Sequence, residues 1–145
     1  MRDRRTAKKL PPPLPGDHPC SGCGSLCCRY LAVHVDPPSD LDDCDVVRWY
    51  LVHRGVCVYV DRDGDWYVQV GARCKRLDRS GACTDYERRP NVCRDYSHDS
   101  CERSDDDAEN IAEFSSAEEF DAFVAVNFRV VGRKLRRRHR TWRPA

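Results

Sequence analysis

The sequence lacks several features that would assign it to a common class at once. It has no run of 18 apolar residues, about the length of a membrane-spanning helix. Neither charge sign dominates, since 25 Lys and Arg against 24 Asp and Glu give a net charge of +1. Residues 1–19 carry charges and prolines where a secretory signal needs an apolar stretch. No internal repeat or phosphate-binding motif is visible. We therefore expect a cytoplasmic protein that neither spans a membrane nor is exported.

The length and composition are sufficient for one folded domain with a core, because 40% of the 145 residues are hydrophobic. Residues 1–19 are basic and rich in proline, which predicts a flexible arm. We expect a single domain over residues 20–139 and a short tail over residues 140–145.

The first half of the chain predicts an α+β domain. Residues 30–35 and 56–60 are typical of strands, and an Asp63-Gly64 turn leads from the second run into residues 66–70. We therefore expect a small three-stranded sheet. A helix at about 40–54, capped by Ser39 or Asp40, would place Cys44 on its apolar side, where the thiol would pack in the core.

The second half predicts an irregular region followed by a helix. Residues 71–101 have no helical periodicity, and such a long loop needs bracing, which metal ligation would supply. Ser115 and Glu118 form a capping box pattern. Apolar residues between Phe120 and Leu135 then share one side at 100° per residue, and five basic residues suit the end of a helix: Arg133, Lys134, Arg136, Arg137 and Arg138. This pattern predicts a long C-terminal helix packed on the sheet.

Cysteine is the residue in excess. The chain has ten, or about 7% of its residues, and in a reducing compartment clustered thiols bind metal more often than they form crosslinks. Eight of the ten fall into two groups of four: Cys20, Cys23, Cys27 and Cys28, then Cys74, Cys83, Cys93 and Cys101.

The spacing of these cysteines favours an inorganic centre. The two-residue gap between Cys20 and Cys23 allows both sulfurs to face one point, and four thiolates complete a tetrahedral zinc site or hold an iron-sulfur cluster. Eight thiolates suffice for two such sites or one larger cluster. Thiolates also concentrate negative charge, and eight cations lie beside them, either offsetting this charge or forming a solvated surface: Arg29, Arg73, Lys75, Arg76, Arg79, Arg88, Arg89 and Arg94.

The two cysteine groups carry a family resemblance. The first reads C-S-G-C-G-S-L-C-C over residues 20–28, and the second contains C-T-D-Y-E-R-R-P-N-V-C-R-D-Y over residues 83–96. Together they resemble the CxxCxxCC or YkgJ-type family of small bacterial proteins, described as zinc- or iron-chelating, and its signature C-x-I-Y-E-x-R-P-x-x-C-R-x-[FY]. Two departures are that three residues precede Cys27, where the family name implies two, and that Asp85 replaces an apolar residue.

The resemblance covers about residues 20–101 and implies a metal site built from the eight cysteines. Family members occur alone or fused to other domains, including a flagellin lysine methylase with an iron-sulfur cluster. Matched residue by residue, Arg89 and Pro90 would shape the turn that delivers Cys93, since proline fixes its own φ and favours an extended conformation before it. Tyr86 and Glu87 would brace this loop, with Glu87 as a partner for Arg94.

Four functional hypotheses remain at this stage. We favour a non-catalytic domain in which zinc or an iron-sulfur cluster fixes the loops, structural or accessory in role and with a protein partner left open. The alternative is an iron-dependent redox or group-transfer protein, although no catalytic residue can be named. A disulfide-braced binding protein is opposed by the adjacent pair Cys27-Cys28. Nucleic-acid binding by the basic run 129–143 is less favoured than a solvated helix end or a partner-docking tail, because the overall charge is balanced and an acidic segment lies upstream.

Overall fold

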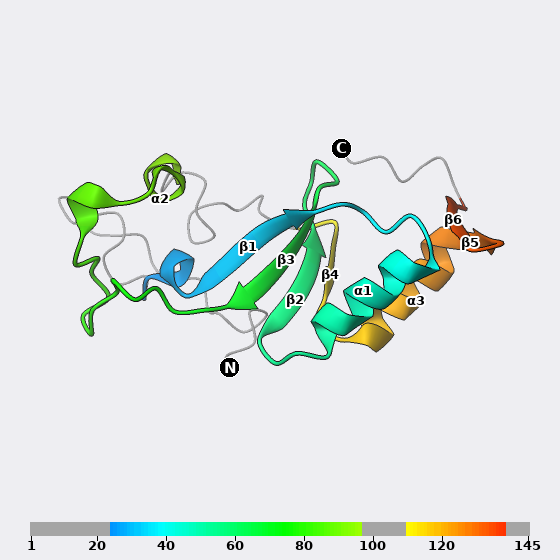
Figure 1. The fold of residues 1–145 in the computed structure, drawn as a ribbon, viewed down its shortest axis with the longest axis horizontal. Coiled ribbons are helices and arrows are strands. Elements are labelled where there is room, and N and C mark those ends of the chain that lie inside the picture. Colours follow the sequence, from blue (N-terminus) through cyan, green and yellow to red (C-terminus); the bar gives the residue numbers. More distant parts are fainter. Residues whose placement is uncertain (1–23, 97–109, 139–145) are drawn as a thin grey trace. The chain divides into compact units, whose positions relative to one another are not determined.

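Residues 24–96 and 110–138 are described by the computed structural model of the chain. Figure 1 shows the order of the elements along them. The chain divides into two compact units, the first formed by residues 1–31 and 72–108 and the second by residues 32–71 and 109–145. The predicted arm at 1–19 and tail at 140–145 lie outside the described residues.

The sheet contains the three predicted strands and one more. Its strands are β1 (Tyr30–Val35), β2 (Val56–Val60), β3 (Trp66–Gly71) and β4 (Ala112–Phe114), antiparallel in the order β1-β3-β2-β4. The turn between β2 and β3 is closed by Asp61, whose carboxylate accepts hydrogen bonds from the N–H groups of Asp63 and Asp65 at 3.0 and 2.9 Å. Gly64 adopts φ 89° there, as a tight turn requires.

The prediction of a three-stranded sheet is therefore wrong by one strand. β4 pairs with β2 in the register Val58↔Phe114 and Val60↔Ala112. Three residues are too few to display an alternating pattern, and β4 follows an acidic stretch, so the sequence carried little strand signal here. Phe114 is only 3% exposed, and its burial provides the packing that attaches this short edge strand.

The first helix, α1 (Leu41–Leu51), forms where the sequence predicts one. Asp40 is its N-cap, and its carboxylate accepts from the N–H groups of Asp42 and Asp43. The helix ends at Leu51 rather than near residue 54, and Gly55 follows with φ 78°. Cys44 is completely buried on the inner side of α1, which confirms its predicted packing role. In the described ranges no helix has the length and hydrophobicity needed to cross a bilayer.

The predicted long C-terminal helix is wrong beyond residue 127. Helix α3 (Ala117–Asn127) is capped by Ser116, which accepts from the Glu119 N–H at 3.3 Å, one residue later than the predicted box. The chain then forms a hairpin of β5 (Phe128–Val131) and β6 (Lys134–Arg137). Its turn contains Gly132 at φ 63°, a conformation that breaks a helix but suits a tight turn.

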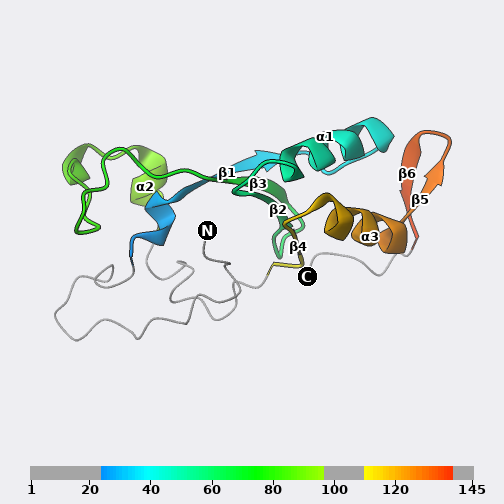
Figure 2. The same ribbon diagram turned by 90° about the horizontal axis from the view of Figure 1, so that it is seen from below.

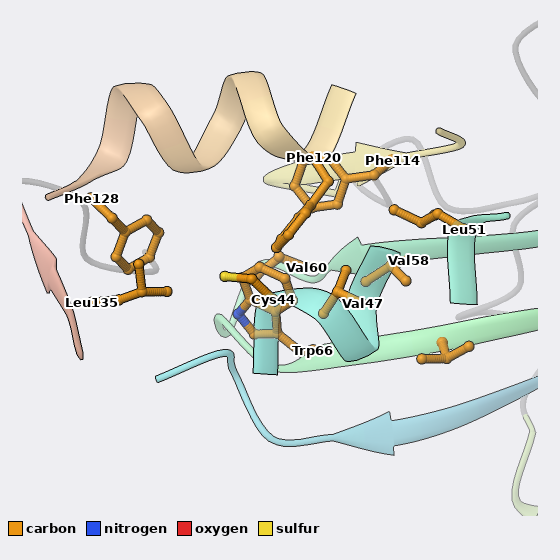
Figure 3. Close-up of a cluster of buried hydrophobic side chains, with 11 residues drawn as sticks. Cys44, Val47, Leu51, Val58, Val60, Trp66, Phe114, Phe120, Phe128 and Leu135 are labelled. Carbon is orange, nitrogen blue, oxygen red and sulfur yellow. The ribbon is translucent and has the colours of Figure 1, made fainter. Parts of the chain in front are cut away.

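The core of the second unit lies between the sheet and the two helices. Figures 1 and 2 show α1 and α3 side by side, with the hairpin beyond the end of α3. Trp66 is 1% exposed, and its ring centroid lies 6.1, 6.4 and 6.1 Å from those of Phe114, Phe120 and Phe123. Figure 3 shows Trp66, Phe114 and Phe120 of this cluster, together with Phe128 of the hairpin. These aromatic contacts join β3, β4 and α3 into one core.

Candidate metal centre

The candidate centre is built from the first unit, whose described part consists of residues 24–31 and 72–96. Its elements are short: a 3₁₀ turn η2 (Leu26–Cys28), a second 3₁₀ turn η3 (Tyr86–Arg88) and one helical turn α2 (Asn91–Asp95). Leu77 is its buried apolar side chain in these ranges, at 7% exposure. With so little apolar burial, these loops depend on polar contacts for their order.

Two residues in the left-handed backbone conformation shape the first cysteine segment. Gly24 and Ser25 adopt φ 70° and 57°, and Ser25 then starts the turn η2, in which the Cys28 N–H donates to the Ser25 carbonyl at 3.0 Å. The Ser25 hydroxyl donates to the carbonyl of Gly81 in the distant loop. This geometry presents Cys27 as an exposed side chain and Cys28 as a half-buried one.

Main-chain hydrogen bonds join the two cysteine segments directly. The Cys74 N–H donates to the Cys28 carbonyl at 2.7 Å, and the Ala72 N–H donates to the Arg29 carbonyl at 2.9 Å. Main-chain hydrogen bonding therefore holds Cys28 and Cys74 next to each other, although they are 46 positions apart in the sequence. The Leu77 N–H donates to the Cys74 carbonyl at 3.2 Å, which forms a turn directly after Cys74.

Cys83 is positioned by a loop that closes on itself. The Asp78 N–H donates to the Ala82 carbonyl at 2.9 Å, and the Asp78 carboxylate accepts from the Ala82 N–H at 2.9 Å and the Ser80 hydroxyl at 2.7 Å. The Ser80 hydroxyl and the Ala82 N–H, in that order, lower the pKa of Asp78, which favours the charged form that closes the loop. An isolated bridge pairs Leu77 with Cys83.

Cys93 follows a proline turn of the predicted kind. Arg89 has φ −62° and ψ 144°, the extended conformation expected before a proline, and Pro90 precedes α2. The Cys93 N–H donates to the Pro90 carbonyl at 3.0 Å. The Arg89 guanidinium lies 3.5 Å from the ring centroid of Tyr86, an arrangement that favours a cation–π interaction and fixes both side chains at the start of the turn.

Five of the seven arginines beside the cysteines donate to main-chain carbonyls. Arg94 shows this most clearly, because its Nε donates to the Arg89 carbonyl at 3.0 Å and its Nη2 to the Glu87 carbonyl at 2.5 Å. The predicted partnership of Arg94 with Glu87 thus involves the carbonyl of Glu87. Four further arginines act similarly on other carbonyls: Arg29, Arg73, Arg76 and Arg89. Their guanidinium groups supply loop order that the small apolar core does not.

Asp85 is a structural centre that the sequence did not reveal. Its carboxylate, 18% exposed, lies 2.9 Å from Arg76 Nη1 and 2.8 Å from Arg88 Nε. The family pattern has an apolar residue at this position. The presence of an aspartate instead was the sequence feature that could have indicated this role. An apolar group at this position cannot make either ion pair, and this chain therefore connects the loop by charge.

The cysteine side chains are close enough to influence one another. Burial raises the pKa of the Cys28 thiol, and a hydrogen bond with Cys27 lowers it. Negative charge on three other cysteines raises the pKa of Cys28 further: Cys74, Cys83 and Cys93. Thiolates gathered in this way repel one another, and a shared cation would relieve the repulsion.

The described residues contain part of the predicted ligand set. Five of its cysteines lie in the described part of the first unit: Cys27, Cys28, Cys74, Cys83 and Cys93. Cys20, Cys23 and Cys101 lie outside the described residues. Within the described ranges, no three His, Cys, Asp or Glu side chains converge to form a metal-binding group. The donor chemistry nevertheless fits zinc or an iron-sulfur cluster, because thiolates are the soft ligands that these centres prefer. The thiols lie on loops of one unit.

The fold and this site define a small α+β protein with a cysteine-rich loop unit braced by guanidinium groups. Residues 19–120 match the model of the CxxCxxCC family, described as a "putative zinc- or iron-chelating domain". The match covers most of the chain, and the protein therefore belongs to this family, as the resemblance of its motifs predicted. No curated protein and no solved structure matches the chain.

Proposed function

We propose that the protein is a small intracellular metal-binding protein that holds zinc or an iron-sulfur cluster through eight cysteines. The proposed ligands are Cys20, Cys23, Cys27, Cys28, Cys74, Cys83, Cys93 and Cys101. The bound centre would fix the loops of the first unit, in a structural or accessory role. Closed coordination by thiolates alone needs no general base and leaves no open position for substrate.

One observation carries this proposal: the hydrogen bond of 2.7 Å from the Cys74 N–H to the Cys28 carbonyl. It brings a member of each cysteine group to adjacent positions on paired backbone. Because the bond is made by the main chain, it does not depend on the state of the thiols. Arg73 beside Cys74 also donates to the Leu77 and Asp78 carbonyls, and Arg76 donates to the Arg88 carbonyl, which connects the Cys74 segment to the loop before Cys93.

Each part of the loop unit then has a defined task. The thiolates bind the metal, and the metal supplies the crosslink that joins the loops. Arg94 and Arg89 hold three carbonyls of the segment that precedes Pro90, so that α2 presents Cys93 in a fixed orientation. Asp85 connects Arg76 to Arg88 through two ion pairs and so joins the segment after Cys74 to the η3 turn.

The test is metal analysis of the full chain purified without oxygen. We expect stoichiometric zinc or iron in the wild type, loss of most of it in Cys28→Ser and Cys74→Ser, and retention in Cys57→Ala. Cys57 is a matched control because it is a cysteine of β2 in the second unit and is not one of the proposed ligands. Equal metal content in all four proteins, or none in the wild type, would refute the proposal.

Visible absorption of the same samples separates the two kinds of centre. A colourless protein with stoichiometric zinc would exclude the redox or group-transfer alternative, since zinc has no redox chemistry. A brown protein that bleaches in air would exclude structural zinc and indicate an iron-sulfur cluster.

A further inference from the structure

The hairpin of β5 and β6 carries two arginines directly opposite each other. Its register pairs Arg129 with Arg136 and Val131 with Lys134. Residues paired across antiparallel strands project on the same face, so these four form one side of the hairpin. All four are exposed, and Val131 is 53% exposed.

The opposite face of the hairpin fixes it to the second unit. Phe128 and Leu135 project there, each 9% exposed, and Figure 3 shows their side chains close together. Main-chain bonds also hold the hairpin against the start of α1. The Leu41 N–H donates to the Arg133 carbonyl at 3.0 Å, and the Leu135 N–H donates to the Ser39 carbonyl at 2.9 Å. The arginine face is therefore presented on a rigid support.

Several cations of the hairpin have partners within the protein. Arg133 pairs with Asp42, Lys134 Nζ lies 3.1 Å from Asp40 Oδ2, and Arg138 donates to the Phe128 carbonyl at 2.7 Å. Arg129 and Arg136 differ, because neither guanidinium has an acidic or carbonyl partner among the described residues.

Two like charges directly opposite on paired strands destabilise a hairpin. Anionic groups that contact the two guanidinium groups, one each, would offset this repulsion, and arginine is the residue best suited to a phosphate, because its planar fork donates two parallel hydrogen bonds. We propose that the exposed face of the β5–β6 hairpin binds the phosphate backbone of double-stranded DNA through Arg129 and Arg136.

The form of the hairpin favours a DNA duplex over other polyanions. A two-stranded β-ribbon fits the major groove of B-form DNA, whereas the major groove of an RNA duplex is too deep and narrow for side chains. Single-stranded nucleic acid is bound by stacking on aromatic side chains, and the only aromatic residue of β5 and β6, Phe128, is buried. The hairpin also follows the segment matched to the metal-chelating family, residues 19–120, so this proposal does not depend on the proposed function.

Fluorescence anisotropy with a short labelled DNA duplex of mixed sequence tests the proposal on the full chain. Each phosphate contact contributes about 0.9 to the slope of log affinity against log salt concentration, so Arg129→Gln/Arg136→Gln should lower the slope by about 1.8. Between 50 and 200 mM salt, the wild type should then lose about 12-fold more affinity than this variant does. Arg54→Gln/Arg62→Gln removes the same charge from exposed sites outside the hairpin and should keep the wild-type slope.

A fold control accompanies the measurement. Removal of two opposed charges should leave the melting temperature of Arg129→Gln/Arg136→Gln equal to that of the wild type or higher, so that lost binding reflects lost contacts. No binding by the wild type at low salt would overturn the proposal, as would an unchanged slope in the hairpin variant. Displacement of the duplex by polyglutamate at equal charge concentration would also overturn it, since the face would then fit an acidic protein.

Discussion

An arginine beside the cysteines can either compensate thiolate charge or hold main-chain carbonyls, and substitutions of Arg94 distinguish these two roles. If it compensates thiolate charge, lysine should replace it, because the charge is kept. If it holds the carbonyls of Glu87 and Arg89, lysine should fail, because a single ammonium group cannot reproduce two hydrogen bonds in the geometry of a fork. We predict that Arg94→Lys weakens zinc binding nearly as much as Arg94→Gln.

The size of the effect follows from the two hydrogen bonds. Both involve a charged donor, but Arg94 is exposed, and solvent reduces each contribution to about 0.5–1 kcal/mol. Their loss would cost about 1–2 kcal/mol of loop order. If Cys93 is a ligand, as proposed, the loop must be ordered for metal to bind, and the same energy then appears as an affinity about 5–30 times weaker.

The assay is competition for zinc between the reduced protein and a coloured chelator, with far-ultraviolet circular dichroism as a check on folding. Arg79→Gln serves as the matched control, because Arg79 is an exposed arginine of the same unit, and it should bind zinc as the wild type does. Wild-type affinity in Arg94→Lys together with weak binding in Arg94→Gln would refute the carbonyl mechanism and support charge compensation.

Three further predictions concern the second unit, each measured by urea denaturation. Phe120→Ala removes a fully buried ring and should cost about 3–5 kcal/mol, whereas Val126→Ala, at a site 69% exposed, should change stability by less than about 0.5 kcal/mol. Asp40 has its pKa lowered below 3.8, first by the N–H of Asp43, so its stabilising effect is present above that value and is lost as pH falls through the lowered pKa. Asp40→Asn, which can still cap the helix, should therefore lose less stability than the wild type as the pH falls below 3.8. Gly132→Ala should destabilise the protein by about 1–2 kcal/mol, because alanine is strained at φ 63°, whereas a continuous helix would gain about 1 kcal/mol from the same change.

Local patterns were sufficient to predict the parts of the fold that short-range rules control. The strands β1, β2 and β3 and the turn at Asp63-Gly64 form as predicted, since alternation and turn chemistry act over a few residues. β4 could not be predicted, because its three residues are strand only through pairing with β2 and the burial of Phe114. Such tertiary contributions leave no trace in local sequence.

The error at the C-terminal end has a geometric cause. Phe128 and Leu135 are seven residues apart, which places them on one side of a helix after two turns. The same pair lies on one face of a hairpin whose turn falls between them, as the register Val130↔Leu135 requires. Periodicity alone cannot distinguish these two structures. Gly132 was the discriminating residue, because it is unfavourable in the middle of a helix and suited to the turn.

The candidate site was predictable in its chemistry and only partly in its construction. Cysteine spacing and the motif around Pro90 predict a set of thiol ligands, since a ligand must be a specific residue type at a restricted position, and this set stays a prediction. The task of the arginines was not predictable, because a guanidinium that offsets thiolate charge and one that holds a carbonyl look identical in sequence. The contacts of Arg94 favour the second task, and they explain how loops with little apolar burial can hold Cys93 in place. In such a unit, the hydrogen bonds of the arginines supply part of the stabilisation that apolar burial supplies in a larger core.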